Sequence, residues 1–117
     1  MQPAHEVLKE VGAQGRRLRE SIPDVYSTYI SFNKAAMGAG ELSARTKQLI
    51  ALAIAVSKEC DGCIASHARA AAAEGATRQE VAEALGVTIV MNGGPGTVWA
   101  PRAMAAFEAY ATDAAAP

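Results

Sequence analysis

Alanine dominates this chain and limits what it can fold into. The 117 residues include 27 alanines but only three Tyr, two Phe and one Trp. Alanine is the strongest helix former, whereas strands are enriched in aromatic and β-branched side chains. The balance therefore predicts an all-α fold and argues against a strand-rich one. A chain of this length builds one modest core, so we expect a single domain over residues 1–117.

Charge and hydropathy exclude several classes of protein. Lys and Arg number 11 and Asp and Glu number 12, so no basic surplus exists to neutralise nucleic-acid phosphates or anionic lipids. The longest apolar run, residues 49–56, is eight residues long, whereas a membrane-spanning helix needs about 18. No basic stretch followed by an apolar one marks a secretory signal at the N-terminus. We expect a cytoplasmic protein that binds neither nucleic acid nor a membrane.

Apolar residues recur at helical spacing in six segments, which glycines and prolines separate. The fifth segment has the clearest start, because Thr77 and Glu80 form a Thr-x-x-Glu capping box. Pro101 removes a backbone hydrogen bond anywhere beyond a first turn, so we expect the sixth helix to begin or kink there. The expected helices, caps included, span residues 4–20, 23–37, 43–56, 60–74, 77–92 and 98–112, with a frayed tail over 113–117.

We expect these helices to form one compact bundle, with Gly12 and Gly15 weakening the first helix. The third helix is apolar around most of its circumference, which predicts a central and buried position. The third, fourth and fifth helices together carry more apolar surface than so small a domain can hide from water. The sequence therefore predicts a homo-oligomer.

Both cysteines lie in Cys60-Asp61-Gly62-Cys63, and His67 follows four residues later. In a continuous helix these three side chains fall within an arc of about 60°. The spacing puts the two cysteine Cα atoms about 5 Å apart, within the range that a disulfide spans. A helix N-terminus and a nearby imidazole both favour the thiolate, which is the reactive form of cysteine. The cluster predicts a reversible redox dithiol.

Other interpretations of these residues remain open. The cysteines could be buried small apolar side chains without chemistry. Cys60, Cys63 and His67 could also be three of the four ligands of a structural zinc site. The fourth ligand would then be His5, Glu59 or Asp61. Residues 92–96 could present backbone N–H groups to an anion, although a helix break is the simpler explanation. We expect no metal and no cofactor.

Four segments carry a family resemblance. They are Leu49–Val56, Cys60-x-x-Cys63-x-x-x-His67, Gly75-Ala76-Thr77-x-x-Glu80 and Gly93-Gly94-Pro95. Over about residues 40–110 the chain resembles the AhpD-like (alkylhydroperoxidase D-like) branch of the carboxymuconolactone decarboxylase superfamily. The resemblance implies an AhpD-like six-helix fold that assembles into obligate trimers or hexamers.

The resemblance also implies an antioxidant enzyme, a peroxiredoxin-like thiol peroxidase or a disulfide reductase. Cys63 would take an oxygen from a hydroperoxide to give a sulfenic acid, and Cys60 would condense with it to a disulfide. His67 would hold or relay the proton, and a lipoyl group or another thiol protein would reset the pair. The family usually places a glutamate at the position of Gln48. Because an amide cannot accept and release a proton, we expect weaker peroxidase turnover.

Two further functions are consistent with the sequence. One is a decarboxylase-like lactone enzyme, the activity from which the superfamily takes its name. The cysteine pair argues against it, since that chemistry needs no dithiol. The other is a non-catalytic, redox-sensing oligomeric module whose packing changes when the dithiol is oxidised, an idea that Gln48 makes more credible.

Overall fold

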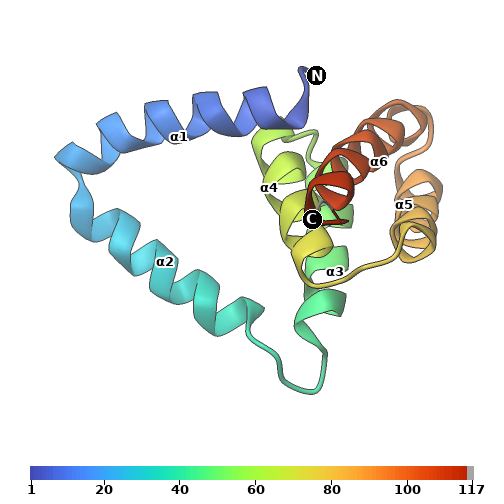
Figure 1. Cartoon of the computed structure of the whole chain (residues 1–117), viewed down its shortest axis with the longest axis horizontal. Helices are drawn as coiled ribbons and strands as arrows, with labels where there is room; N and C mark the ends of the chain where they lie inside the picture. Colours follow the sequence, from blue (N-terminus) through green and yellow to red (C-terminus); the bar gives the residue numbers. More distant parts are fainter. Residues whose placement is uncertain (116–117) are drawn as a thin grey trace.

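The computed structural model describes residues 1–115, and the side chains of residues 1–111. The regular structure of the described residues consists of six α-helices (Figure 1). These helices are α1 (Ala4–Ser21), α2 (Pro23–Met37), α3 (Ala44–Ser57), α4 (Asp61–Ala73), α5 (Arg78–Asn92) and α6 (Gly94–Ala115). The all-α prediction is confirmed, and the first five helices begin within one residue of their expected starts. Gly12 and Gly15 do not interrupt α1.

The core lies among α3, α4, α5 and α6, which group together on one side of the molecule in Figure 1. Leu52, Ile64 and Val81 supply the largest fully buried side chains from α3, α4 and α5, together with Val56. Elsewhere in α4 and α6 small side chains let the helices approach one another closely. These are Ala65, Ala68, Ala71, Ala100, Ala103 and Ala106. The abundance of alanine thus serves helix packing as well as helix formation.

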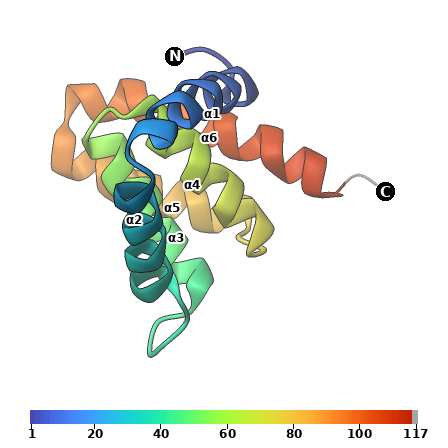
Figure 2. The same cartoon turned by 90° about the vertical axis from the view of Figure 1, so that its left-hand side faces the viewer.

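Two helices extend from this core, so the six-helix bundle is less compact than the sequence predicted. α1 buries only Ala4 and Val7, near its N-terminal end. α2 buries no residue. Figure 1 shows α1 and α2 as an arm that extends away from the other helices, and Figure 2 shows α2 standing in front of α3. The apolar side chains Val25, Tyr29, Ile30 and Phe32 of α2 therefore stay exposed.

Apolar side chains are also exposed on the core helices. α3 buries Leu52, but Ile50 and Ile54 on its other side are 45% and 51% exposed. The prediction of a central and buried third helix therefore holds for one face of α3 and fails for the other. On α5, Val90 is 82% exposed. Among the described residues, no helix combines the length and the apolar stretch that crossing a membrane requires.

The start of α6 differs from the prediction. The helix begins at Gly94 rather than at residue 98, and Pro95 occupies its first turn, where a missing N–H group costs nothing. Gly96 allows this early start, because a Cβ atom there would lie 2.9 Å from the Cα atom of Ile89. Pro101 therefore lies inside the helix. Residues 113–115 continue α6 instead of fraying, and residues 116–117 of the expected tail lie outside the described residues.

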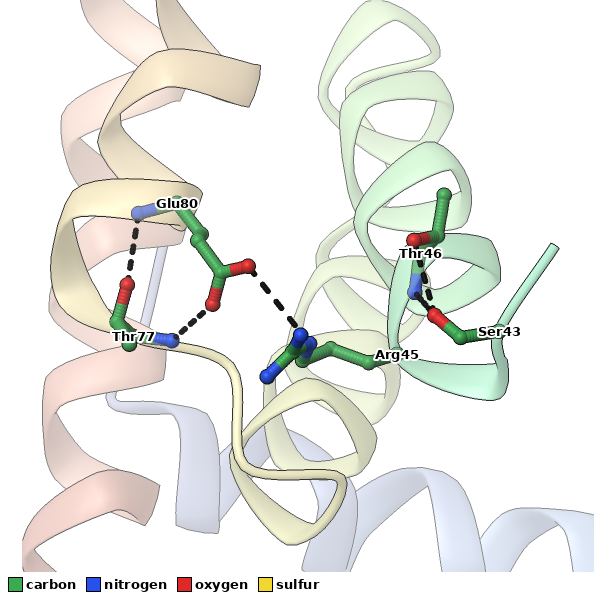
Figure 3. A network of polar contacts seen from close by, with 5 residues as sticks. All are labelled: Ser43, Arg45, Thr46, Thr77 and Glu80. Atoms are coloured by element: carbon green, nitrogen blue, oxygen red, sulfur yellow. Dashed lines mark hydrogen bonds and ion pairs between the residues drawn. The ribbon is translucent and has the colours of Figure 1, made fainter.

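Side-chain caps hold the starts of α3 and α5 and connect them (Figure 3). Ser43 Oγ accepts the backbone N–H of Thr46 at 3.0 Å. The predicted capping box is confirmed: Thr77 Oγ1 accepts the Glu80 N–H at 3.1 Å, and Glu80 Oε1 accepts the Thr77 N–H at 2.9 Å. Glu80 Oε2 lies 3.6 Å from Arg45 Nε. The Thr77 backbone hydrogen bond holds the pKa of Glu80 below its ordinary value, and Arg45 acts in the same direction.

Candidate redox site

Cys60 and Cys63 form a disulfide, with their Cα atoms 5.2 Å apart. The sequence predicts that Cys60 lies within the helix. In the structure Cys60 instead precedes α4 as its N-cap, with an extended backbone. Its Sγ atom accepts the backbone N–H of Cys63 at 3.2 Å. The predicted common arc therefore applies within α4 only to Cys63 and His67. The sulfur of Cys60 instead takes the place that a serine or aspartate oxygen usually fills at a helix start.

A tight turn at the end of α3 places Cys60 at the start of α4. The Cys60 N–H donates to Ala55 O at 3.2 Å and the Glu59 N–H donates to Val56 O at 3.0 Å, the two hydrogen bonds of a Schellman motif. Glu59 has a φ of 53°, in the left-handed region that favours glycine. α4 ends with the same motif, but there Gly75 holds the left-handed position. The residue immediately before the disulfide is therefore strained.

His67 contacts Gln48, and this contact joins α4 to α3 one helical turn beyond Cys63. His67 Nδ1 lies 2.8 Å from Gln48 Oε1, and both side chains are half-buried. Because an amide oxygen only accepts hydrogen bonds, Nδ1 carries the proton and Nε2 is left with a lone pair. Burial lowers the pKa of His67 below its ordinary value. The imidazole is therefore neutral at pH 7 and can accept a proton through Nε2.

The two cysteines differ in their exposure. Cys63 is exposed, whereas Cys60 is half-buried at the start of α4. An incoming thiolate therefore reaches Cys63 more readily. If the disulfide opens by attack at Cys63, Cys60 leaves as a thiolate that the Cys63 N–H and the helix N-terminus stabilise. The arrangement is suited to thiol–disulfide exchange.

A groove of about 540 Å³ runs along α1 beside the start of α4. The Cβ atom of a side chain at Gly62 would lie 3.4 Å from Val11 Cγ2, so α1 packs directly on the turn between the cysteines. The groove is lined by Met1, Gln2, Val7, Glu10, Val11, Gln14 and Asp61. Sequence reasoning missed the α1 residues, because nothing in their local pattern indicates a contact some 50 positions away.

The zinc alternative lacks its ligand cluster. Over the part of the chain that the structure describes, no three His, Cys, Asp or Glu side chains gather closely enough to hold a metal ion. The two sulfurs bind each other, and Nδ1 of His67 is engaged by Gln48. In this oxidised form the three residues therefore do not form a ligand cluster.

Comparison with known proteins decides the family. The sequence model of the carboxymuconolactone decarboxylase family matches residues 23–112. The chain belongs to this family. The membership confirms the resemblance drawn from the motifs, and the AhpD-like branch lies within the same superfamily. The matched residues also include α2, which the motifs did not cover.

Individual proteins are similar to this family member over most of their length. The crystal structure of apo-lpg0406, a member of this family from Legionella pneumophila, has a TM-score of 0.89 and 36% identity, covering 92% of this chain and 96% of that one. An uncharacterised protein of Cupriavidus necator is 41% identical over 102 residues, 87% of this chain and 90% of that protein. Uncharacterised protein 4 in the cox locus of Paracoccus denitrificans is 36% identical over 92 residues, 79% and 80% of the two proteins.

Proposed function

We propose that this protein is a thiol-dependent oxidoreductase in which Cys60 and Cys63 catalyse disulfide reduction or the breakdown of hydroperoxides. The observation that carries the proposal is the disulfide at the start of α4, in which Cys63 is an exposed residue and Cys60 caps the helix through its sulfur. Family membership supports an enzyme but names no substrate. Of the two activities, thiol–disulfide exchange is the better supported, because it needs no proton acceptor at position 48.

Thiol–disulfide exchange proceeds in two steps. An external thiolate attacks Cys63 Sγ, a mixed disulfide forms, and Cys60 leaves as a thiolate at the helix N-terminus. A second thiolate then attacks the external sulfur of the mixed disulfide and releases Cys63. Two external thiols become one disulfide, and the two electrons and two protons end on Cys60 and Cys63. A lipoyl group or another thiol protein would supply these electrons.

The peroxidase reaction, unlike thiol–disulfide exchange, requires a base that removes the thiol proton of Cys63 and passes it on. The Cys63 thiolate would attack the hydroperoxide, break its O–O bond and become a sulfenic acid, while the alkoxide takes a proton and leaves as an alcohol. Cys60 would then form the disulfide and release water. His67 can accept the thiol proton at Nε2, but its other partner, Gln48, is an amide that cannot carry the proton onward. We therefore expect slow hydroperoxide turnover.

The first experiment measures the reduction potential of the Cys60–Cys63 pair in redox buffers and the thiol pKa values by pH-dependent alkylation with mass spectrometry. A reversible disulfide with one thiol titrating well below about 8.5 supports the proposal. Cys63→Ser should abolish turnover of disulfides and hydroperoxides, whereas Ser57→Ala, an exposed control, should not. Unperturbed, inert thiols or full activity in Cys63→Ser would refute the proposal.

A non-catalytic redox sensor is the second candidate, and two observations favour it. Gln48 occupies the place of the family's usual carboxylate, and Cys60 is itself the N-cap of α4, so reduction changes the group that holds a helix end. This candidate predicts an oligomeric state that switches with the redox state of the cysteines, together with undetectable turnover. Size-exclusion chromatography of the oxidised and reduced protein distinguishes it from the enzyme.

We also propose that the working form is a homo-oligomer, a trimer or hexamer as the family resemblance implies. Exposed apolar side chains on α2, α3 and α5 support this proposal. The arm formed by α1 and α2 includes a helix, α2, that buries none of its residues in the described part of the chain.

A further inference from the structure

We infer that α2 of one copy of this chain docks on the outer side of α3 and α5 of a second copy. The inference rests on the proposed homo-oligomer and adds to it the two surfaces that meet. The receiving surface, called here the α3–α5 patch, consists of the exposed apolar side chains Ile50, Ile54, Val87, Val90 and Met91.

The docking helix, α2, exposes a continuous apolar stripe. Val25, Tyr29 and Phe32 fall within an arc of about 60° at helical spacing, and each is more than 60% exposed. Tyr29 and Phe32 also border a shallow hollow of about 170 Å³ on the same helix. The 15 residues of α2 include two ionised side chains, Asp24 and Lys34. A helix that stayed in water would carry more charge, so this composition is typical of a helix that contacts another protein surface.

Two contacts hold α3 and α5 side by side in the same direction. Glu80 Oε2 lies 3.6 Å from Arg45 Nε, which joins the starts of the two helices (Figure 3). Asn92 Nδ2 donates to Ser57 Oγ at 2.9 Å, which joins their C-terminal ends. The two helices therefore form one outer wall with a furrow between them.

The α3–α5 patch lies on this outer wall. Ile50, Ile54 and Ser57 follow one another at spacings of four and three residues, so they share one side of α3. Because Ser57 binds the end of α5, Val90 and Met91 lie beside that side, and they are 82% and 77% exposed. The sequence from residue 84 to residue 101 contains no Asp, Glu, Lys, Arg or His. The patch is therefore a continuous apolar surface.

The two surfaces match in size and shape. Tyr29 and Phe32 are about two-thirds exposed, so each offers on the order of 150 Å² of apolar surface. With Val25 on one side and the patch on the other, docking buries on the order of 1,000 Å² of large apolar side chains. Flanking polar residues bring the total to the roughly 1,200 Å² at which stable interfaces begin. One helix fits the furrow between two helices, whereas pairing α2 with α2 would leave the patch in water.

The charges at the ends of the two surfaces are complementary. Asp24 lies in the first turn of α2 and Lys34 in its last turn, about 15 Å apart along the helix. On the receiving wall, Lys58 follows the C-terminal end of α3, and Glu83 lies toward the start of α5. Docking antiparallel to α3 and α5 brings Asp24 to Lys58 and Lys34 to Glu83 and opposes the helix dipoles. Parallel docking would bring like charges together.

Two charged variants and their mixture test the docking. Phe32→Asp on α2 and Val90→Asp on the patch should each lose the wild-type assembly, because either change buries an unpartnered carboxylate. An equimolar mixture should form a complex of two chains, since it combines one intact α2 with one intact patch. Ser27→Asp on the opposite side of α2 and Ala105→Asp on exposed α6 are the matched controls. Light scattering after size-exclusion chromatography measures the masses, and circular dichroism verifies the helix content.

Charge reversal tests the antiparallel orientation. Lys34→Glu and Glu83→Lys should each raise the apparent dissociation constant about threefold or more at low ionic strength, as expected for an exposed ion pair. The double variant should return toward the wild-type value, because the pair is restored with its signs exchanged. An additive loss in the double variant would overturn this orientation.

The outcomes separate the docking inference from the proposal on which it rests. A monomeric wild type overturns the homo-oligomer and the docking together. A wild-type oligomer that persists in Val90→Asp overturns the docking and leaves the homo-oligomer in place. Two dissociated variants whose mixture forms no complex also overturn the docking, since α2 and the patch would then belong to different interfaces.

Discussion

At the scale of single residues, Gln48 decides what His67 can do. Its amide oxygen fixes the proton on Nδ1 but adds no negative charge, so burial alone determines the direction of the pKa shift. A carboxylate at the same place would favour the imidazolium and would also accept its proton. In the proposed peroxidase reaction, His67 would therefore lack a base to which it could pass the proton.

The Gln48→Glu variant tests this interpretation. The new carboxylate should raise the pKa of His67 by stabilising the imidazolium, and it should increase hydroperoxide turnover by about tenfold or more, as a working general base does. NMR titration of the His67 ring and a hydroperoxide consumption assay measure the two effects. Gln79→Glu, on the exposed side of α5, serves as the charge control. A His67 pKa that does not move would show that the 2.8 Å contact does not govern it.

The lowered pKa of His67 also makes stability depend on pH. In the unfolded chain the imidazole titrates near its ordinary value of about 6.5, so just below that pH the unfolded state binds more protons than the folded state. The contribution of neutral His67 is fully present above about pH 6.5 and is lost as pH falls toward the lowered folded-state pKa. Urea unfolding between pH 5 and 8 should show this decline, and His67→Gln should remove it. An equal slope in His67→Gln would assign the decline to other groups.

At the scale of elements, the two Schellman turns offer an internal comparison. Both have the same hydrogen bonds, but Glu59 and Gly75 occupy their left-handed positions. A residue with a Cβ atom pays about 1 kcal/mol or more for this backbone conformation, and glycine does not. The end of α3 that positions Cys60 is therefore less stable than the end of α4.

We expect Glu59→Gly to raise the free energy of unfolding by about 1 kcal/mol, because it relieves the left-handed strain. Glu59→Ala removes the same charge but keeps the Cβ atom, and should gain little. Denaturant unfolding of the oxidised proteins measures both values. A gain in Glu59→Ala as large as that in Glu59→Gly would show that the carboxylate, not the backbone, was the source of the difference.

At the scale of the whole molecule, the arm of α1 and α2 carries a large exposed apolar surface. A helix of 15 residues that buries nothing is marginal in water, because helix stability in proteins comes mainly from packing. Val25, Tyr29 and Phe32 lie on one side of α2, and Phe32 is 68% exposed. Association with other copies of the chain would bury this side.

We expect light scattering coupled to size-exclusion chromatography to show an oligomer for the wild type. Phe32→Asp should shift it toward the monomer, because a carboxylate in an apolar interface loses its hydration without a partner. Ser27→Asp adds the same charge on the opposite side of α2 and should leave the assembly unchanged. A monomeric wild type would contradict the prediction directly.

Most of the secondary structure could be predicted because its determinants are local. The Thr77–Glu80 capping box, the glycine and proline boundaries and the cysteine spacing all act within about four residues along the chain. The exceptions are informative. The start of α6 depends on a close approach of Gly96 to α5, and the position of Cys60 depends on the left-handed Glu59. Neither the close approach at Gly96 nor the backbone conformation of Glu59 alters the spacing of apolar residues from which the helices were predicted.

The sequence by itself determined the helical class, five of the six helix starts, the dithiol and the superfamily, because these follow from propensity and short-range spacing. Only the tertiary structure decided which residues of other helices contact α4: the hydrogen bond from His67 to Gln48, 19 positions away, and the contact of Val11 with Gly62. It also decided that α2 stands apart from the core. The physical reason is that an apolar helix face indicates burial but does not indicate which other surface covers it. That surface depends on the packing of the whole chain.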